Sequence, residues 1–416
     1  MVLIGSYLVI ASAITLSSAY LARSFAELRM AETYLNTYQS FYSAEAGANR
    51  TLQWLRSLPG PPSGIEAFDP FENSPDPSYS VSVDPYDGNP TNILKRYRIT
   101  ARGFGGDLAN PKAARQVIME VEMGNFAQYV YATDSEKMPW NNDMYTVWFV
   151  TRDQLDGPAH TNGQMNISGD PVFEGQVTTV DSSLNYMHGG PPEDNPEFNG
   201  SLELGSTSVT LPSRVTELRS AAATGGLTFS GDTLIQLNAD GTMTYTNFAS
   251  GQVNVTVPVP NNGAVFVDEG ELHVWGTVDG SLTVGASGNI FIEDNLVYKD
   301  NPVSVPESDD YLGIISESNV LIPPGAPDDL YIHGSVMALS DYFSVEEWYG
   351  DRKGTLHLYG GVIQKHRGAV GSFDSRTNEI VSGYQKDYHH DPRFKIKPPP
   401  YYPDTGAYRV LMWAEQ

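Results

Sequence analysis

The amino-terminal stretch from Met1 to Ala22 constrains the fold more than any other part of the sequence. Its 22 residues, MVLIGSYLVIASAITLSSAYLA, contain no formally charged side chain and no proline. As an α-helix this stretch is about 33 Å long, because each residue adds ~1.5 Å, and the hydrocarbon core of a typical bilayer is about 30 Å thick. The stretch is therefore able to cross a membrane as a single helix.

The helical pattern continues beyond the apolar stretch without interruption. Apolar side chains recur near helical spacing, and the first proline is Pro59. The residues that set this spacing are Phe25, Leu28, Leu35, Tyr38, Phe41, Tyr42, Leu52 and Leu55. The sequence thus predicts a first domain, residues 1–58, that consists of one helix about 85 Å long.

Two ordinary explanations of an apolar amino terminus fit this pattern poorly. A cleaved secretory signal has a basic region, a short apolar stretch and a cleavage site, whereas here the apolar stretch has no basic region before it and no break after it. A simple anchor with a cytoplasmic amino terminus conflicts with Arg23, because basic residues normally stay on the cytoplasmic side. We therefore expect that a basic leader was removed directly before Met1.

Two segments of the predicted helix resemble the type IV pilin superfamily, particularly its large minor-pilin-like members. They are Glu27-Leu28-Arg29-Met30-Ala31 and Phe41-Tyr42-Ser43-Ala44-Glu45-Ala46-Gly47, the second of which is similar to the FxAAEAG segment of pilins. The resemblance implies a filament subunit that has other pilin subunits as partners and Met1 as an N-methylated terminus. It also implies residence in the bacterial cytoplasmic membrane before assembly, and in an extracellular filament or at the cell surface afterwards. The residues expected to form the assembly surface are Leu3, Ile4, Gly5, Tyr7, Leu8, Ile10, Ile14, Leu16 and Leu21.

Position 5 departs from the pilin pattern. Pilins usually carry a glutamate at this position, where it is thought to pair with the terminal amine of a neighbouring subunit, but this chain has Gly5. A carboxylate inside a membrane is costly and therefore functional where it occurs, so its absence removes one assembly device. Major and minor subunit roles both stay open, because small residues such as Gly5 also let helices approach closely.

A small antiparallel sheet is expected after the helix, in a second domain of residues 59–125. The sequence Pro59-Gly60-Pro61-Pro62 ends the helix. Three alternating runs follow a proline- and aspartate-rich loop, at Tyr79–Val83, Tyr97–Arg102 and Gln116–Glu122. In pilins such a sheet covers the second half of the long helix.

The third domain, residues 126–416, repeats one local pattern. Leu272–Val278, Leu330–Val336 and Leu356–Val362 all read apolar-x-apolar-x-Gly-x-Val. Short strands with a glycine at each corner suit a parallel β-solenoid, although the irregular spacing leaves a β-sandwich as an alternative. The run from His160 to Val177 resembles the β-rich extracellular region that follows pilin-like helices in large bacterial proteins. The whole chain is thus predicted to be α+β, with a long helix, a small antiparallel meander and a large, mostly β region.

Charge and composition exclude several functions. The formal net charge is −25, and residues 1–58 contribute four basic and three acidic side chains, so the acidic excess lies in the β-rich part. Such a surface repels phosphate backbones, and we therefore expect no nucleic-acid partner. The chain has no cysteine, which excludes disulfides, cysteine-ligated zinc and thiol catalysis.

No catalytic, cofactor or metal site stands out in the sequence. The candidates are runs of two or three adjacent residues, and neighbouring residues on a strand point to opposite faces, so we expect solvated loops and no enzyme activity. These candidates are Asp309-Asp310, Asp328-Asp329, Glu346-Glu347 and His389-His390-Asp391. The alternative function is that of an anchored, non-polymerising surface protein whose solenoid binds or cleaves glycans, which makes a surface glycan a second candidate partner. Candidate N-glycosylation sites are Asn166, Asn199 and Asn254.

Overall fold

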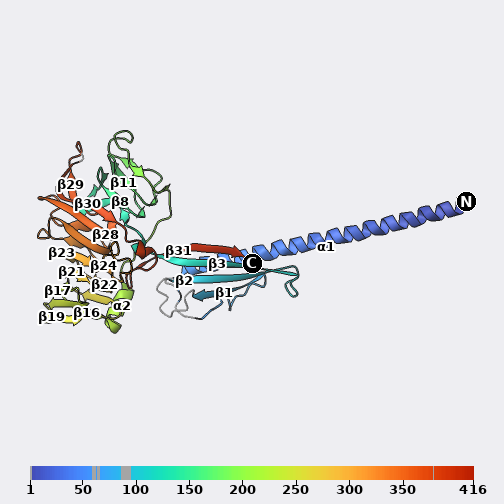
Figure 1. The fold of residues 1–416 in the computed structure, drawn as a ribbon, viewed down its shortest axis with the longest axis horizontal. Coiled ribbons are helices and arrows are strands. Elements are labelled where there is room, and N and C mark those ends of the chain that lie inside the picture. Colours follow the sequence, from blue (N-terminus) through green and yellow to red (C-terminus); the bar gives the residue numbers. More distant parts are fainter. Residues whose placement is uncertain (1, 59–61, 63–65, 86–94, 378) are drawn as a thin grey trace. The chain divides into compact units, whose positions relative to one another are not determined.

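The computed structural model describes all residues of the chain except 1, 59–61, 63–65, 86–94 and 378 (Figure 1). It separates into two compact units, one formed by Met1–Met123 with Ala407–Gln416 and the other by Gly124–Gly406. A long helix and a small sheet make up the first unit, and the second unit is mostly strand. The predicted α+β class is confirmed.

Helix α1, Val2–Ser57, is the predicted long helix, and it begins the first unit. Its carboxy-terminal part packs on an antiparallel sheet of strand order β1-β2-β3-β31, through the buried residues Ala44, Ala48, Leu52 and Leu55. The strands of this sheet are β1 (Tyr79–Pro85), β2 (Arg96–Gly105), β3 (Ala113–Asn125) and β31 (Asp404–Glu415). The three runs predicted from alternation are β1, β2 and β3, each extended by a few residues.

The last strand of this sheet comes from the carboxy terminus of the chain. Residues 407–416, which the sequence analysis assigned to the domain 126–416, belong to the first unit. Gln416 donates its backbone N–H to the Gln116 carbonyl at 2.8 Å, and the Arg409 guanidinium lies 2.6 Å from the Glu122 carboxylate. Tyr408 is buried in the core between helix and sheet. Strand pairing with β3 and burial of Tyr408 thus return the chain end to the first unit.

The second unit is built from short strands that pair in parallel from one coil of the chain to the next. This pairing is that of a solenoid and differs from the antiparallel sheets of a sandwich. The first stack consists, in spatial order, of β16 (Leu227–Ser230), β20 (Ala264–Asp268), β22 (Ser281–Ala286), β24 (Tyr311–Ser316), β26 (Leu330–Ala338), β28 (Arg352–His366), β4 (Tyr131–Ser135), β9 (Ala159–Thr161), β12 (Val177–Thr179) and β15 (Leu202–Leu204).

Two further stacks complete the coils. The second stack contains parts of β26 and β28 together with β21 (Leu272–Val278), β23 (Ile290–Tyr298), β30 (Ile380–His389), β8 (Gln154–Asp156), β11 (Val172–Phe173) and β14 (Glu197–Phe198). The third stack contains the other halves of β21 and β23 together with β17 (Thr233–Leu237), β25 (Val320–Ile322) and β27 (Phe343–Val345), and separately β7 (Phe149–Val150), β10 (Asn166–Ser168) and β13 (Asn185–Tyr186).

Antiparallel pairs and short helices extend these stacks. Strand β18 pairs with β17 and β19, β29 pairs with β30, and β5 pairs with β6 in a separate hairpin. The bounds of these elements are β18 (Thr242–Asn247), β19 (Gln252–Pro258), β29 (Gly371–Phe373), β5 (Lys137–Trp140), β6 (Asp143–Thr146), α2 (Thr216–Gly225), η1 (Phe126–Gln128) and η2 (Pro392–Lys395).

The coils of the solenoid do not follow one another in chain order. Strand β28 pairs with β4, bringing Val362 opposite Tyr131, and β30 pairs with β8, bringing Tyr388 opposite Leu155. We call this junction between the last and first coils the seam. Residues 205–226 connect β15, at one end of the solenoid, to β16, at the other end, and we call them the crossing segment. Figure 1 shows β16 near β17 and β19. The first strand of the second unit along the chain, β4, therefore lies in the middle of the solenoid, between β28 and β9.

The recurring glycine of the sequence pattern lies at a corner of the coil. The copies in β26 and β28 pair residue for residue, so that Gly334 lies opposite Gly360. Both have positive φ, 136° and 149°, and a Cβ on Gly360 would lie only 1.9 Å from the Gly334 carbonyl oxygen. Only glycine fits this stacked corner without strain.

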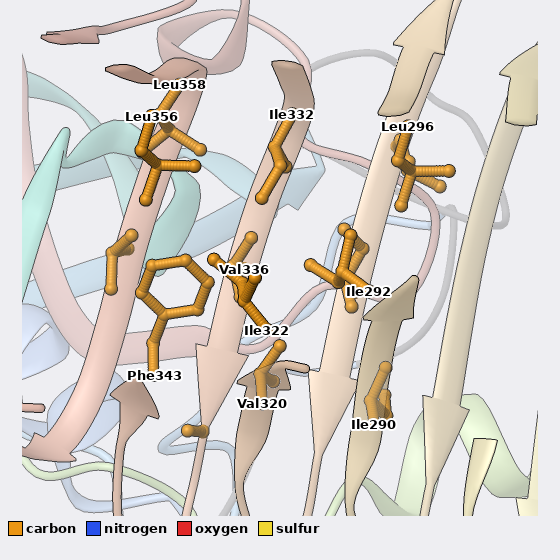
Figure 2. Close-up of a cluster of buried hydrophobic side chains, with 14 of the residues drawn as sticks. Ile290, Ile292, Leu296, Val320, Ile322, Ile332, Val336, Phe343, Leu356 and Leu358 are labelled. Carbon is orange, nitrogen blue, oxygen red and sulfur yellow. The ribbon is translucent and has the colours of Figure 1, made fainter. Parts of the chain in front are cut away.

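Inside the coils, like side chains stack on like. The buried core of the second unit contains Ile290, Val320 and Phe343 in one column, and Leu296, Ile332 and Leu358 in another. Figure 2 shows these side chains pointing from successive strands toward one shared interior. Burial of such side chains contributes about 1.5–3 kcal/mol each relative to exposure, so the stack of coils supplies its own core.

Candidate functional site

Apolar side chains cover the amino-terminal part of α1 on every side and stay exposed. Leu3 is 87% exposed and Leu35 is 68% exposed. No other element of the first unit's described residues lies beside the first half of the helix (Figure 1), whereas from Glu32 onward one side of the helix contacts Lys112 and β2. We call these residues the exposed helix surface: Leu3, Ile4, Tyr7, Leu8, Val9, Ile10, Ile14, Leu16, Tyr20, Leu21, Phe25, Leu28, Met30, Tyr34, Leu35, Tyr38 and Tyr42.

The predicted assembly residues lie on this surface. The eight larger ones, from Leu3 to Leu21, are all exposed, and a Cβ on Gly5 would meet no atom within 4 Å. Their participation in contacts between helices stays a prediction. Met1, the predicted methylated terminus, lies outside the described residues.

Two hydroxyl groups near the apolar end, those of Thr15 and Ser18, are satisfied within the helix. The Thr15 hydroxyl donates to the Ala11 carbonyl at 2.9 Å, and the Ser18 hydroxyl donates to the Thr15 carbonyl at 2.9 Å. In a medium without water, an unsatisfied polar group costs several kcal/mol. These internal bonds therefore make this part of the helix suitable for hydrocarbon or for a dry helix bundle.

Within the part of the chain that the structure describes, one helix, Leu3–Ser57, is long and apolar enough to cross a membrane. Its most apolar window has a mean hydropathy of 1.5 and none of it is buried. Charged residues begin only at Arg23, which pairs with Glu27 at 2.9 Å. Further along, Glu32 is paired with Lys112, whose ammonium lowers the pKa of the Glu32 carboxyl.

The carboxy-terminal part of α1 is held against the sheet by small residues. A Cβ on Gly103 of β2 would lie 2.1 Å from the Ser40 carbonyl oxygen, and a Cβ on Gly105 would lie 1.9 Å from the Asn36 carbonyl oxygen. The helix and strand backbones therefore touch directly, with Ser40 and Ala44 fully buried between them. This contact fixes the base from which the exposed helix surface projects.

The acidic pairs named from the sequence hold loops in place. The buried carboxylate of Asp310 accepts the backbone N–H groups of Gly280 at 2.6 Å and Asp300 at 2.8 Å. Asp329 accepts the Thr355 N–H at 2.9 Å, and burial together with neighbouring carboxylates raises the pKa of Glu346. Among the described residues, no group of three or more histidine or acidic side chains is placed to hold a metal ion.

The three adjacent residues from His389 to Asp391 are separated by the fold. The His390 ring is buried and lies 3.0 Å from the Ala127 carbonyl oxygen, and burial lowers its pKa. His389 instead faces Asp387 at 2.9 Å. Asp391 pairs with Arg393 at 2.7 Å, and the Arg393 guanidinium also donates to the carbonyls of Ser308 and Asp310. The pair ties the chain after the last coil to a loop before β24.

One of the candidate glycosylation sites, Asn166, is buried and hydrogen-bonded. Asn166 is only 4% exposed, and its side chain accepts a hydrogen bond from Asn185 at 2.8 Å and donates to the carbonyls of Glu136 and Val147. An amide buried in this ladder is not available as a surface acceptor. Asn199 and Asn254 are exposed, and their modification stays a prediction.

The exposed apolar side chains of α1 extend further than the predicted assembly residues. Those residues lie between Leu3 and Leu21, whereas the exposed helix surface continues through Tyr34 and Leu35 to Tyr42. The signal was present in the helical spacing of apolar residues after Arg23, which the sequence analysis used only to extend the helix.

In comparisons with known proteins, the chain matches a protein family and a solved structure. The family described as a domain of unknown function (DUF4900) matches residues 94–182. Among solved structures, the crystal structure of the competence-associated pilin ComZ from Thermus thermophilus matches with 11% sequence identity and a TM-score of 0.38, over 92% of this chain and 98% of that one. No curated protein matches the chain.

Proposed function

We propose that the protein is a structural subunit of a type IV pilus-like filament that assembles through α1 and has no catalytic role. In this proposal the helix is held in the cytoplasmic membrane before assembly and is surrounded by the helices of other pilin subunits afterwards. The acidic β-rich unit is displayed outside. One observation carries the proposal, namely that the exposed helix surface continues well past the segment that a membrane would cover.

The length of this surface is the reason that lipid alone does not account for it. Residues up to Ala22 suffice to span a hydrocarbon core of about 30 Å. Leu35 lies about 20 Å further along the helix axis, since each residue adds ~1.5 Å, and the headgroup layer on one side is only about 5–8 Å thick. Tyr34, Leu35 and Tyr38 are each more than 60% exposed, so a solitary anchor would leave them in water.

Neighbouring helices would cover both parts of the surface at once. Large apolar patches that are exposed in a soluble state mark sites of association. The loss of lipid contact on leaving the membrane is offset when the same side chains pack against other helices, because the apolar area stays out of water. The small residues Gly5, Ala11 and Ala13 permit close helix approach without the membrane-embedded glutamate of most pilins.

The alternative is an anchored surface protein that does not polymerise. It shares the membrane segment but gives no function to the apolar residues between Phe25 and Tyr42. The two functions predict different outcomes for a charge placed at Leu35, which lies outside the bilayer but inside a filament core.

The test compares two single variants in cells that make the chain from its own gene. Leu35→Lys is expected to lower the amount of the chain in sheared surface filaments at least tenfold, because a lysine in a helix bundle is costly, and to leave its amount in the membrane fraction unchanged. Val253→Lys is the matched control, since Val253 is 65% exposed on β19 of the second unit. Immunogold electron microscopy of the filaments, with an antibody to the second unit, gives the readout.

Two results would overturn the proposal. One is a wild-type chain that is found in membranes and never in filaments. The other is equal incorporation of the Leu35→Lys and Val253→Lys variants. Mass spectrometry of the amino-terminal peptide tests the processing prediction separately, because an intact leader before Met1 would favour the anchored protein.

A further inference from the structure

An aromatic pocket lies at the seam of the solenoid. The cavity has a volume of about 210 Å³ and is bounded by the β5–β6 hairpin on one side and by β29, β30 and the chain after β27 on the other. The first side belongs to the first coil and the second side to the last. Its walls include three of the six tryptophans of the chain, Trp140, Trp148 and Trp348, together with Tyr145.

The aromatic rings of the wall are arranged around Trp140. The Trp140 ring centroid lies 5.4 Å from that of Trp348 and 5.4 Å from that of Tyr145, with interplanar angles of 68° and 63°. In an edge-to-face pair one ring covers a single face of the other, so such a pair does not enclose both faces of its rings. Tyr145 is 46% exposed, so the wall is open to a molecule that arrives from solvent.

Polar groups lie in the same pocket next to this wall. Lys386 and Asp153 both line it, and the Lys386 ammonium donates to the Asp153 carboxylate at 2.8 Å. The side chains are 17% and 4% exposed. Asp153 also accepts the Val150 N–H at 3.1 Å through the oxygen that bonds to Lys386. A charged donor and a charged acceptor therefore stand side by side against an apolar wall.

We propose that this aromatic pocket binds a single neutral pyranose ring of a surface glycan. The C–H face of the sugar would lie on the Trp140 and Trp348 rings, and two neighbouring hydroxyls would bond to the Lys386 ammonium and the Asp153 carboxylate. The proposal does not depend on filament assembly, because the pocket lies entirely within the second unit.

Size and charge select this class of ligand. Pockets for drug-sized molecules are about 300–1,000 Å³, so a cavity of about 210 Å³ suits one ring. An anion is disfavoured by Asp153 and by the net charge of −25. A purely apolar ligand would exclude water from Lys386 and Asp153 without replacing its hydrogen bonds. A ring with one apolar face and several hydroxyls satisfies both the wall and the polar pair.

The test measures binding to the full-length chain in a detergent without a sugar headgroup. The probes are methyl α-D-glucopyranoside, methyl β-D-galactopyranoside, methyl α-D-mannopyranoside and N-acetyl-D-glucosamine. Binding of each probe is measured by tryptophan fluorescence and by calorimetry. We expect at least one to bind saturably, and Trp140→Ala and Trp348→Ala each to raise its Kd at least tenfold. Trp275→Ala is the matched control, because Trp275 lies on β21 outside the pocket, and its Kd should stay unchanged.

Three results would overturn the proposal. One is the absence of binding for every pyranoside up to about 50 mM, well above the 1 mM that corresponds to roughly −4.1 kcal/mol. The second is binding of N-acetyl-leucinamide without any pyranoside, which would assign the pocket to an apolar peptide side chain. The third is sugar binding that Trp140→Ala and Trp348→Ala do not weaken. Where one of these variants fails to fold, Tyr145→Ala reports on the same wall from an exposed position.

Discussion

Arg367 donates to the carboxylate of Glu136 across the seam at 2.9 Å, although the two residues are 231 positions apart in the chain. Both side chains are 2% exposed. The guanidinium also lies 3.6 Å from the centre of the Phe149 ring and donates to the Trp148 carbonyl at 3.0 Å. An arginine from the last coil is thus fully enclosed by groups from the first coils, which makes this pair the polar centre of the seam.

Replacing Arg367 should strongly destabilise the second unit. Arg367→Met leaves the buried Glu136 carboxylate without its cationic partner, with only the hydroxyls of Tyr131 and Thr133 still donating to it. Breaking a buried pair on one side typically costs about 3–5 kcal/mol. Denaturation of the full-length chain, followed by tryptophan fluorescence, measures the loss. Arg152→Met is the control, because the Arg152–Glu379 pair is 45% and 47% exposed and should contribute less than about 1 kcal/mol. Similar losses in both variants would contradict a special role of the seam pair.

The stacked corner predicts that Gly360 does not tolerate a side chain. In Gly360→Ala the new Cβ would overlap the Gly334 carbonyl oxygen, and φ is 149°. Backbone strain and overpacking together should lower the free energy of unfolding by about 2–5 kcal/mol. Gly325→Ala serves as the control, since a Cβ there meets no atom within 4 Å. Equal melting temperatures for the two variants would show that the corner adjusts without strain.

Buried histidines should make the second unit less stable in acid. The His333 Nδ1 accepts the Tyr298 backbone N–H at 3.0 Å, and burial lowers the pKa of His333 from 6.5 to about 4. The unfolded chain therefore binds more protons between these values, so stability is complete above pH 6.5 and falls as the pH drops toward 4. Burial also lowers the pKa of His160, His366 and His390, which act in the same direction.

The variant His333→Asn isolates one part of this effect. An asparagine amide oxygen can still accept the Tyr298 N–H, but it does not titrate. The loss of unfolding free energy between pH 6.5 and 4 should therefore be smaller than in the wild type by up to about 3 kcal/mol. Denaturation curves at several pH values in this window measure the difference, and parallel pH profiles for the two chains would contradict the assignment to His333.

Local patterns in the sequence were sufficient for the elements whose partners are near in the chain. Helical spacing and the absence of proline predicted α1, and alternation predicted β1, β2 and β3. The glycine pattern predicted corners that stack, because Leu330–Val336 and Leu356–Val362 belong to successive coils. In each case the spacing of apolar or glycine residues along the sequence matches the repeat of the structure that those residues form.

Partners distant in the chain were not predictable in this way. Nothing in the sequence around Val362 indicates that it pairs with Tyr131, or that β31 returns to β3, because strand pairing depends on main-chain groups that every residue has. Burial of Asn166 was missed for a related reason, since the Asn-Ile-Ser triplet does not show that Asn185 lies on the neighbouring strand. The aromatic pocket escaped prediction because its walls come from both sides of the seam.

The crossing segment should be dispensable for holding the first and last coils together. We expect that a protease site inserted between the exposed residues Ser213 and Arg214 can be cut without opening the seam, because β28 and β30 stay paired with β4 and β8. Hydrogen exchange followed by mass spectrometry should give protection in β4 and β28 within about threefold of the uncut chain. Exchange in α2 should rise, since cutting releases the chain before Val215. Loss of protection in β4 and β28 on cutting would mean that the continuous chain, and not strand pairing, keeps the middle of the solenoid closed.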